Sequence, residues 1–269
     1  MSERADVVII GCGEAGIFAG YELAKRCPEL KIVVLEQGAD IYSRTCPIVQ
    51  GKVDRCIQCK TCGTMCGFGG AGAFSDGKFN FTTEFGGWLT DYMEGREVMD
   101  LIHYVDSVNV HFGATEKVYS TSTPEAMALE REALKYNLHL LQAQCKHLGT
   151  ENNLRILANL YEDLKQRVDF RFHTAVERIE AQPEGGYRLC TDKGDFDCTY
   201  LIAAPGRSGA EWFAGQCKGL GIPLINNQVT SASGWSCPPR CSSTSPTWSM
   251  SPSWSTGPSS TGTVYAPSA

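Results

Sequence analysis

The sequence predicts an α/β protein built on a doubly wound, Rossmann-like sheet, with an antiparallel β-meander and a helical insertion. An apolar β-branched run over 6–10 leads through glycines into a helical stretch over 15–26, and a second apolar run follows over 30–35. Such a strand–helix–strand order is typical of a parallel sheet. Short alternating strands separated by glycine turns appear much later, between 168 and 204. These runs together predict the meander.

The composition is that of a globular protein, with 42% hydrophobic and 20% charged residues in 269. A formal net charge of −6 argues against a nucleic-acid partner. No apolar run approaches the roughly 18 residues of a spanning helix, so we expect no membrane partner. The first apolar run is interrupted by glycines and Glu14, unlike a signal peptide, and we expect a cytoplasmic protein.

The first strand runs directly into Gly11, Gly13 and Gly16, which follow the pattern G-x-G-x-x-G. Gly11 permits a tight turn, Gly13 allows backbone to approach a pyrophosphate, and Gly16 allows close helix–strand packing. Unpaired N–H groups at the helix start, which includes Glu14 and Ala15, favour a phosphate there. We therefore expect all five residues to contact a dinucleotide cofactor.

Glu36 ends the second strand, twenty residues after Gly16. At this distance an acid is placed to accept hydrogen bonds from a ribose 2′-hydroxyl. A carboxylate here disfavours NADP, because the 2′-phosphate of NADP would meet a like charge. The motif alone does not distinguish FAD from NAD.

The later strands are expected over 168–172, 174–180, 187–191 and 198–204, and the last runs into Pro205 and Gly206. Three short antiparallel strands returning to a strand that ends in small residues resemble the second half of the FAD-binding fold. The resemblance implies that the backbone of Val176 meets the adenine. It also implies that the turn at Ala204 and Gly206 closes over the dinucleotide, although Pro205 stands where that fold often has threonine.

The segment GFGGAGAFSDGK, residues 67–78, carries five glycines within eleven residues, which lets backbone approach a ligand closely. This segment resembles a family of largely uncharacterised FAD-dependent dehydrogenases, and the resemblance covers roughly residues 5–228. It implies that Gly69, Gly70, Gly72 and Ser75 lie along the pyrophosphate and flavin. It also implies an FAD-dependent oxidoreductase with a small-molecule substrate and an unidentified electron acceptor; no catalytic residue is indicated.

Four of the thirteen cysteines, Cys56, Cys59, Cys62 and Cys66, have the spacing of bacterial ferredoxin ligands. Convergent thiolates on a turning loop are able to hold an iron–sulfur cluster. A redox-active disulfide such as Cys59–Cys62 would also suit a flavin neighbour. Simple thiols are the third interpretation, and the sequence leaves all three open.

Helices are expected over 90–112, 124–147 and 150–167, where Thr123 and Pro124 supply an N-cap and a first-turn proline. We expect these helices to form a cap or substrate region. Their histidines, His103, His111, His139 and His147, show no catalytic spacing.

From about Val229 the composition changes: Arg240 is the last charged residue, and serine, threonine, proline and tryptophan dominate. Disordered linkers lack tryptophan, and folded domains carry more charge. A shifted reading frame over 230–238 gives an alternating, charged, strand-like text. We therefore expect a frame change after about residue 228, a truncated oxidoreductase, and a tail that adds nothing to the fold.

The expected organisation is a first half of the cofactor domain over 1–45, a Cys- and Gly-rich segment over 46–89, the insertion over 90–167, a second half over 168–228, and the tail over 229–269. The first alternative is an NAD-binding Rossmann enzyme, which would lack the meander and the second glycine-rich loop. The other is a non-catalytic flavin or iron–sulfur electron carrier.

Overall fold

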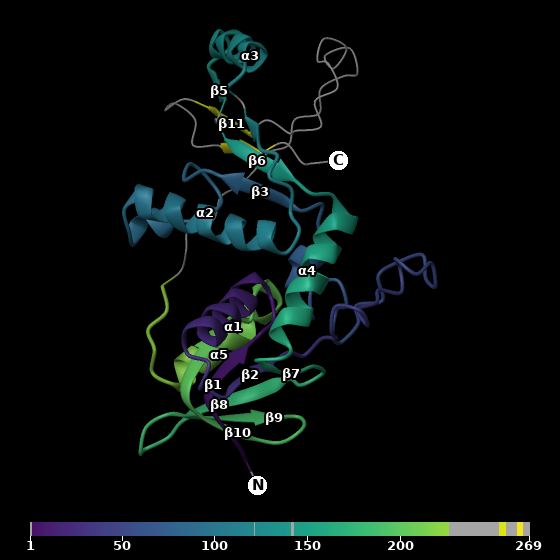
Figure 1. Cartoon of the computed structure of the whole chain (residues 1–269), viewed down its shortest axis with the longest axis vertical. Coiled ribbons are helices and arrows are strands. Elements are labelled where there is room, and N and C mark those ends of the chain that lie inside the picture. Colours follow the sequence, from purple (N-terminus) through teal and green to yellow (C-terminus); the bar gives the residue numbers. More distant parts are fainter. Residues whose placement is uncertain (1, 121, 141–142, 226–252, 257–262, 266–269) are drawn as a thin grey trace. The chain divides into compact units, whose positions relative to one another are not determined.

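The computed structural model describes residues 2–120, 122–140, 143–225, 253–256 and 263–265 (Figure 1). The chain folds into two compact units. The first takes residues 1–78, 106–116 and 147–225, and the second takes residues 79–105, 117–146 and 226–269.

The first unit is built on a sheet whose strand order is β7-β2-β1-β10-β9-β8. Four neighbouring strands are parallel: β7 (Asp169–Arg171), β2 (Ile32–Leu35), β1 (Glu3–Ile10) and β10 (Phe196–Ala203). The antiparallel strands β9 (Tyr187–Thr191) and β8 (Val176–Ala181) extend it from β10. Because the chain adds β2 on one side of β1 and β10 on the other, the sheet is doubly wound, and the predicted fold class is confirmed.

Helix α1 (Glu14–Arg26) covers one face of the parallel strands. Gly16, Gly20 and Ala24 are buried and recur every four residues, so they share one face of the helix. The small side chains let the helix approach the sheet, where Gly20 lies against Ile9 and Val168. Helix α4 (Thr150–Leu164) buries Ile156, Leu157, Leu160 and Leu164 on one side, as its spacing predicts.

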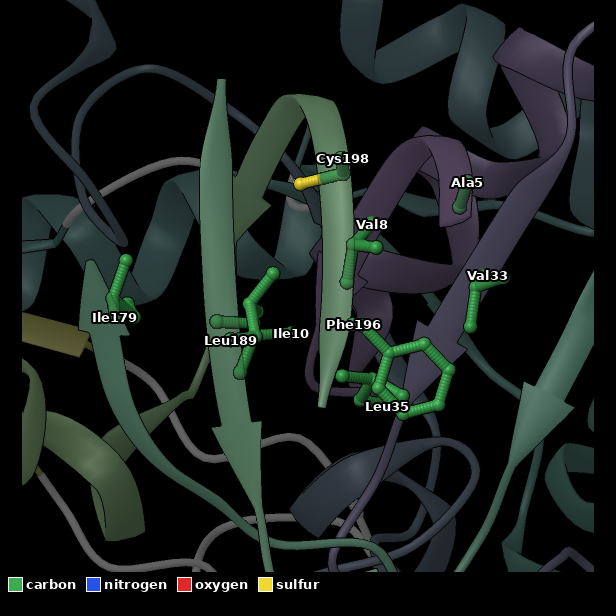
Figure 2. Close-up of a cluster of buried hydrophobic side chains, with 9 residues drawn as sticks. All are labelled: Ala5, Val8, Ile10, Val33, Leu35, Ile179, Leu189, Phe196 and Cys198. Atoms are coloured by element: carbon green, nitrogen blue, oxygen red, sulfur yellow. The ribbon is translucent and has the colours of Figure 1, made fainter. Parts of the chain in front are cut away.

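The β-meander folds back over the other face of the parallel strands. Only residues 172–175 join β7 to β8, although these strands stand at opposite ends of the sheet order. Six flat strands would span about 24 Å, whereas that connection reaches at most about 17 Å, so the sheet must curl. Figure 2 shows the resulting core, in which side chains of the parallel strands meet those of the meander: Ala5, Val8, Ile10, Val33, Leu35, Ile179, Leu189, Phe196 and Cys198.

Two short segments complete the first unit around the ends of the strands. A 3₁₀ turn over Gly70–Phe74 lies in the glycine-rich segment, and another over Arg207–Gly209 leads into α5 (Ala210–Gly219). The indole N–H of Trp212 in α5 donates to the carbonyl of Glu177, which ties α5 to β8.

The second unit contains two small sheets and two helices. One sheet has the order β3-β6-β4, with β3 (Lys78–Phe81), β6 (Gln144–His147) and β4 (Tyr119–Ser120). The other has the order β12-β11-β5, with β12 (Thr263–Tyr265), β11 (Ser253–Thr256) and β5 (Leu138–Leu140). The helices are α3 (Pro124–Leu134) and the first part of α2 (Gly95–His111), whose residues from 106 onward belong to the first unit, and a 3₁₀ turn covers Leu89–Asp91.

The helix expected over 124–147 is wrong in its second half. Helix α3 starts as predicted, with the Thr123 hydroxyl accepting from the N–H of Ala126, but it ends at Leu134. Asn137 has a φ of 57°, a left-handed conformation that ends the helical path. The chain then forms β5 and β6, so the insertion is mixed α/β. The helix expected from residue 90 begins at Gly95, and the helix expected over 150–167 is confirmed as α4.

Two further strand predictions differ from the structure. The run 168–172 was expected among antiparallel strands, but β7 pairs parallel with β2 because it follows the crossover through α4. The tail was expected to add nothing, but β11 and β12 pair with each other and β11 pairs with β5. The alternation of serine or threonine with Trp254 and Val264 suits such strands. The remainder of the tail lies outside the described residues.

Within the described ranges, no helix combines the length and apolar character needed to cross a membrane.

Candidate nucleotide-binding site

The turn between β1 and α1 requires two of its three glycines for steric reasons. Gly11 has a φ of +93°, and a Cβ there would lie 2.3 Å from the carbonyl oxygen of Ala204. A Cβ on Gly16 would lie 2.0 Å from the carbonyl oxygen of Gly11. Gly13 differs, because its Cβ position meets nothing closer than the Cα of Gly70, 4.0 Å away. The first unit therefore gives no steric reason for a glycine at position 13.

The glycine-rich segment docks on this turn. The N–H of Gly69 donates to the carbonyl of Cys12 over 2.8 Å. A Cβ on Gly70 would lie 3.0 Å from the Cα of Gly13. Two stretches of bare backbone, more than fifty residues apart in the chain, thus face the same space.

A cavity of about 550 Å³ opens where these segments meet. It lies at the carboxyl ends of β1, β2 and β10, where the strand order reverses and where ligands of doubly wound sheets bind. The residues that line it come from the glycine turn, β2, the glycine-rich segment, the start of β8 and the turn before α5: Ile10–Glu14, Leu35–Gln37, Met65, Cys66, Gly69–Gly72, Thr174, Val176, Ala204–Gly209 and Trp212.

The electrostatics of the cavity combine one cation, two acids and a helix end. Gly13 is the N-cap of α1 and no side chain caps that end, so the first N–H groups of the helix are available to an anion. Arg207 is an exposed residue on the wall. Glu14 also reaches the cavity, and desolvation by the surrounding protein raises the pKa of its carboxyl.

Glu36 is buried beneath the cavity and bonded to backbone. One carboxylate oxygen accepts from the N–H of Cys12 over 2.8 Å. The other accepts from the N–H groups of Gly38 and Gly67, over 2.8 and 2.9 Å. Glu36 also lines the cavity. Its three bonds to backbone N–H groups are contacts that the sequence did not predict.

Most of the predicted cofactor residues are gathered around this cavity: Gly11, Gly13, Glu14, Glu36, Gly69, Gly70, Gly72, Val176, Ala204 and Gly206. Three are not part of its lining. Ala15 and Gly16 lie in the first turn of α1, where Gly16 packs against the backbone of Gly11. The Ser75 hydroxyl donates to the carbonyl of Gly72, so Ser75 shapes the segment from behind.

The four-cysteine run does not fit an iron–sulfur cluster. In the described part of the chain, no group of three or more Cys, His, Asp or Glu side chains is arranged to hold a metal ion. Cys56 and Cys59 are exposed, whereas Cys66 is buried on the cavity wall, where its sulfur accepts from the Gln37 side chain. The four cysteines thus have the spacing of ferredoxin ligands, but the fold does not bring their sulfur atoms together.

Several residues of the site carry no sequence signal of their own. Cys12, Thr174, Arg207 and Ser208 line the cavity because of their place in the turns, and Arg44 supports the glycine-rich segment from behind. Burial and the nearby Glu36 raise the pKa of the Cys12 thiol, and burial raises that of Cys66. The only pointer to Arg207 and Ser208 was their position directly after Gly206.

Comparison with known sequences gives two matches. The profile of the Thi4 family matches residues 2–41, which contain β1, the glycine turn, α1 and β2. A protein of Clostridium beijerinckii, named only "Uncharacterized protein", is 40% identical over 211 residues, covering 78% of this chain and 32% of that protein. The chain thus spans about a third of the length of this relative.

Solved structures similar to this chain include three enzymes. Glycine oxidase from Geobacillus kaustophilus has a TM-score of 0.48 at 19% identity, covering 83% of this chain and 60% of that chain. L-Amino acid deaminase from Proteus myxofaciens has a TM-score of 0.46 at 17% identity, covering 83% and 49%. L-Proline dehydrogenase from P. horikoshii has a TM-score of 0.43 at 12% identity, covering 81% and 57%.

Proposed function

We propose that this chain is the FAD-binding part of an FAD-dependent oxidoreductase that acts on a small molecule and passes electrons to a separate acceptor. The observation that carries the proposal is the facing pair Gly13 and Gly70, which keeps two backbones free of side chains at the end of a helix. A pyrophosphate needs such a place, because its oxygens must reach backbone N–H groups directly.

In this proposal the two ends of the cavity hold different parts of the ADP moiety. The pyrophosphate lies over Gly13 and Gly70, where the α1 N–H groups and Arg207 favour negative charge. The ribose lies near Glu36, whose carboxylate retains lone pairs after accepting from three N–H groups. The adenine lies at the start of β8, beside Val176. The isoalloxazine would carry the electrons, and the protein binds and orients it.

Two features favour FAD over NAD as the cofactor: the meander and the glycine-rich segment over 67–78. Both contribute to the cavity wall. Absorption spectra of the purified chain, together with titrations of FAD, NAD and ADP, test it directly. We expect FAD and ADP to bind and to compete with each other, and NAD to bind more weakly. An absence of competition between FAD and ADP would contradict the shared site.

The glycines give a sharper test of the same site. Gly13→Val should lower ADP and FAD affinity at least about tenfold, because its side chain enters the space proposed for the ligand, and it should cost less stability than Gly16→Ala. Gly16→Ala should instead destabilise the fold, because its Cβ would collide with the carbonyl of Gly11. Gly87→Ala, at an exposed glycine with open space around it, serves as the control. Thermal melts and titrations compare the three, and wild-type cofactor content in Gly13→Val would refute the site.

A further inference from the structure

The glycine-rich segment is held from one side by a buried arginine. Arg44 is 8% exposed, and its guanidinium donates all five of its N–H groups to backbone carbonyls. Nε and Nη2 donate to Gly63 over 3.1 and 3.0 Å, and Nη2 also donates to Thr64 over 2.9 Å. Nη1 donates to Phe68 and Gly70, both over 2.7 Å. The guanidinium also lies over the ring of Phe74, 4.8 Å from its centroid.

Glu36 holds the same segment by accepting a hydrogen bond from a backbone N–H group. Its Oε1 accepts from Gly67, next to the carbonyls that Arg44 binds, while its Oε2 accepts from Cys12 in the first glycine turn. Arg44 therefore binds carbonyl groups of this short stretch, and Glu36 binds one of its N–H groups. Glu36 in addition links that stretch to the turn on the other side of the cavity.

Every peptide group from 67 to 70 has a partner. Arg44 and Glu36 bind three of these groups. The others are paired with backbone: Phe68 N–H with Ala39, Gly69 N–H with Cys12, Gly70 N–H with the Gly67 carbonyl, and the Gly69 carbonyl with Ala73 N–H. Gly67, Gly69 and Gly70 all have positive φ, which few other residues tolerate. A segment so rich in glycine would otherwise have high conformational freedom.

We propose that Arg44 and Glu36 form a brace that holds residues 63–70 in the conformation that receives a pyrophosphate, with Arg44 as a positioning residue that does not touch the cofactor. This inference rests on the proposed function for the identity of the ligand. The brace gives the Cys- and Gly-rich segment its order without a metal cluster. The brace also brings the charged guanidinium of Arg44 to the carbonyl of Gly70, the residue that faces Gly13.

The experiment compares Arg44→Lys and Arg44→Met with Arg26→Met, a control at an exposed arginine of α1. Lysine keeps the charge but has three donors on a single nitrogen, so it cannot bind four spread carbonyls. We expect both Arg44 variants to lose ADP affinity about tenfold or more, while adenosine, which has no phosphates, binds within about twofold of wild type. Hydrogen exchange should become faster at 63–72 and stay unchanged in α1.

The outcomes separate the brace from the proposed function. If the wild-type chain binds neither ADP nor FAD, the proposed function fails, and hydrogen exchange at 63–72 still decides whether the brace exists. If Arg44→Lys keeps wild-type ADP affinity and exchange protection, the brace is refuted. A parallel fall of ADP and adenosine affinity would show general destabilisation and would also refute positioning. Should Arg44→Met fail to fold, Arg44→Lys carries the comparison.

Discussion

At the scale of single residues, the surroundings of the cysteines shift their pKa values in opposite directions. The N–H of Val49, the Thr64 side chain and the N–H of Ile48 hydrogen bond to the Cys46 sulfur and lower its pKa. Burial acts in the opposite direction on Cys12 and Cys66 and raises their pKa values. Because the thiolate is the nucleophile, a thiol with a lowered pKa is reactive at lower pH.

Alkylation with iodoacetamide, followed by peptide mass spectrometry, should therefore modify Cys46 earlier than Cys12 or Cys66. FAD or ADP should slow labelling of Cys66 further, because Cys66 lines the cavity. Rapid modification of Cys66 in the native chain would contradict its burial.

At the scale of elements, the meander is joined by one well-bonded carboxylate. Asp197 on β10 stands directly opposite Arg188 on β9. Arg188 donates to both carboxylate oxygens, over 2.7 and 3.0 Å, and Gln182 donates to one of them. Arg188 first, then the Ser2 hydroxyl, which also donates to this carboxylate, and Gln182 lower the pKa of Asp197 to about 2. The pair ties neighbouring strands at the edge of the core.

Asp197→Asn should lower the free energy of unfolding by about 1 kcal/mol at neutral pH, since the pair is partly exposed and screened. A depressed folded-state pKa gives stability that is present above the unfolded value near 3.8 and lost as the pH falls toward 2. The difference between wild type and variant should therefore shrink below about pH 4 and be lost only as the pH falls through the folded-state pKa of about 2. Denaturant unfolding at neutral pH and at several lower pH values measures it, and a difference at pH 2 as large as that at neutral pH would contradict the assignment.

At the scale of the whole molecule, the expected frame change bears on cofactor binding. In the proposed function the cavity holds the ADP moiety, and the resemblance to FAD-dependent dehydrogenases implies a C-terminal segment that closes the flavin end. The frame change predicted from the sequence would replace such a segment, and the flavin would then gain little affinity beyond that of ADP. On that prediction we expect this chain to bind FAD weakly, within about tenfold of ADP, which is a difference in binding free energy of about 1.4 kcal/mol or less.

Titration of both ligands tests this expectation, together with iodide quenching of the bound flavin, which should stay accessible. Resequencing the gene decides the reading frame after residue 228. A product in the alternative frame should bind FAD more tightly while its affinity for ADP stays the same. Tight FAD binding by the present chain, with the flavin protected from iodide, would contradict the expectation.

The sequence by itself determined the strand–helix–strand unit and the steric reasons for its glycines. Those features depend on neighbours within about thirty residues: an apolar run, glycines in the pattern G-x-G-x-x-G, and an acid at the end of the second strand. The structure confirms the turn at Gly11 and the packing at Gly16, because these contacts are local. The helix expected over 124–147 is wrong after Leu134, because β6 depends on pairing with strands remote in sequence, which local spacing does not reveal.

Only the tertiary structure decided how the distant pieces meet. No periodicity reveals that Gly70 packs on Gly13, that Glu36 accepts from Gly67, or that Arg44 binds the carbonyls behind the cavity. Nor does cysteine spacing reveal that Cys66 faces the cavity while Cys56 and Cys59 face solvent. Such contacts depend on loop conformation, which is set by hydrogen bonds between backbone and a few side chains. The glycine pattern therefore located the site, and the folded chain determined which side chains support it.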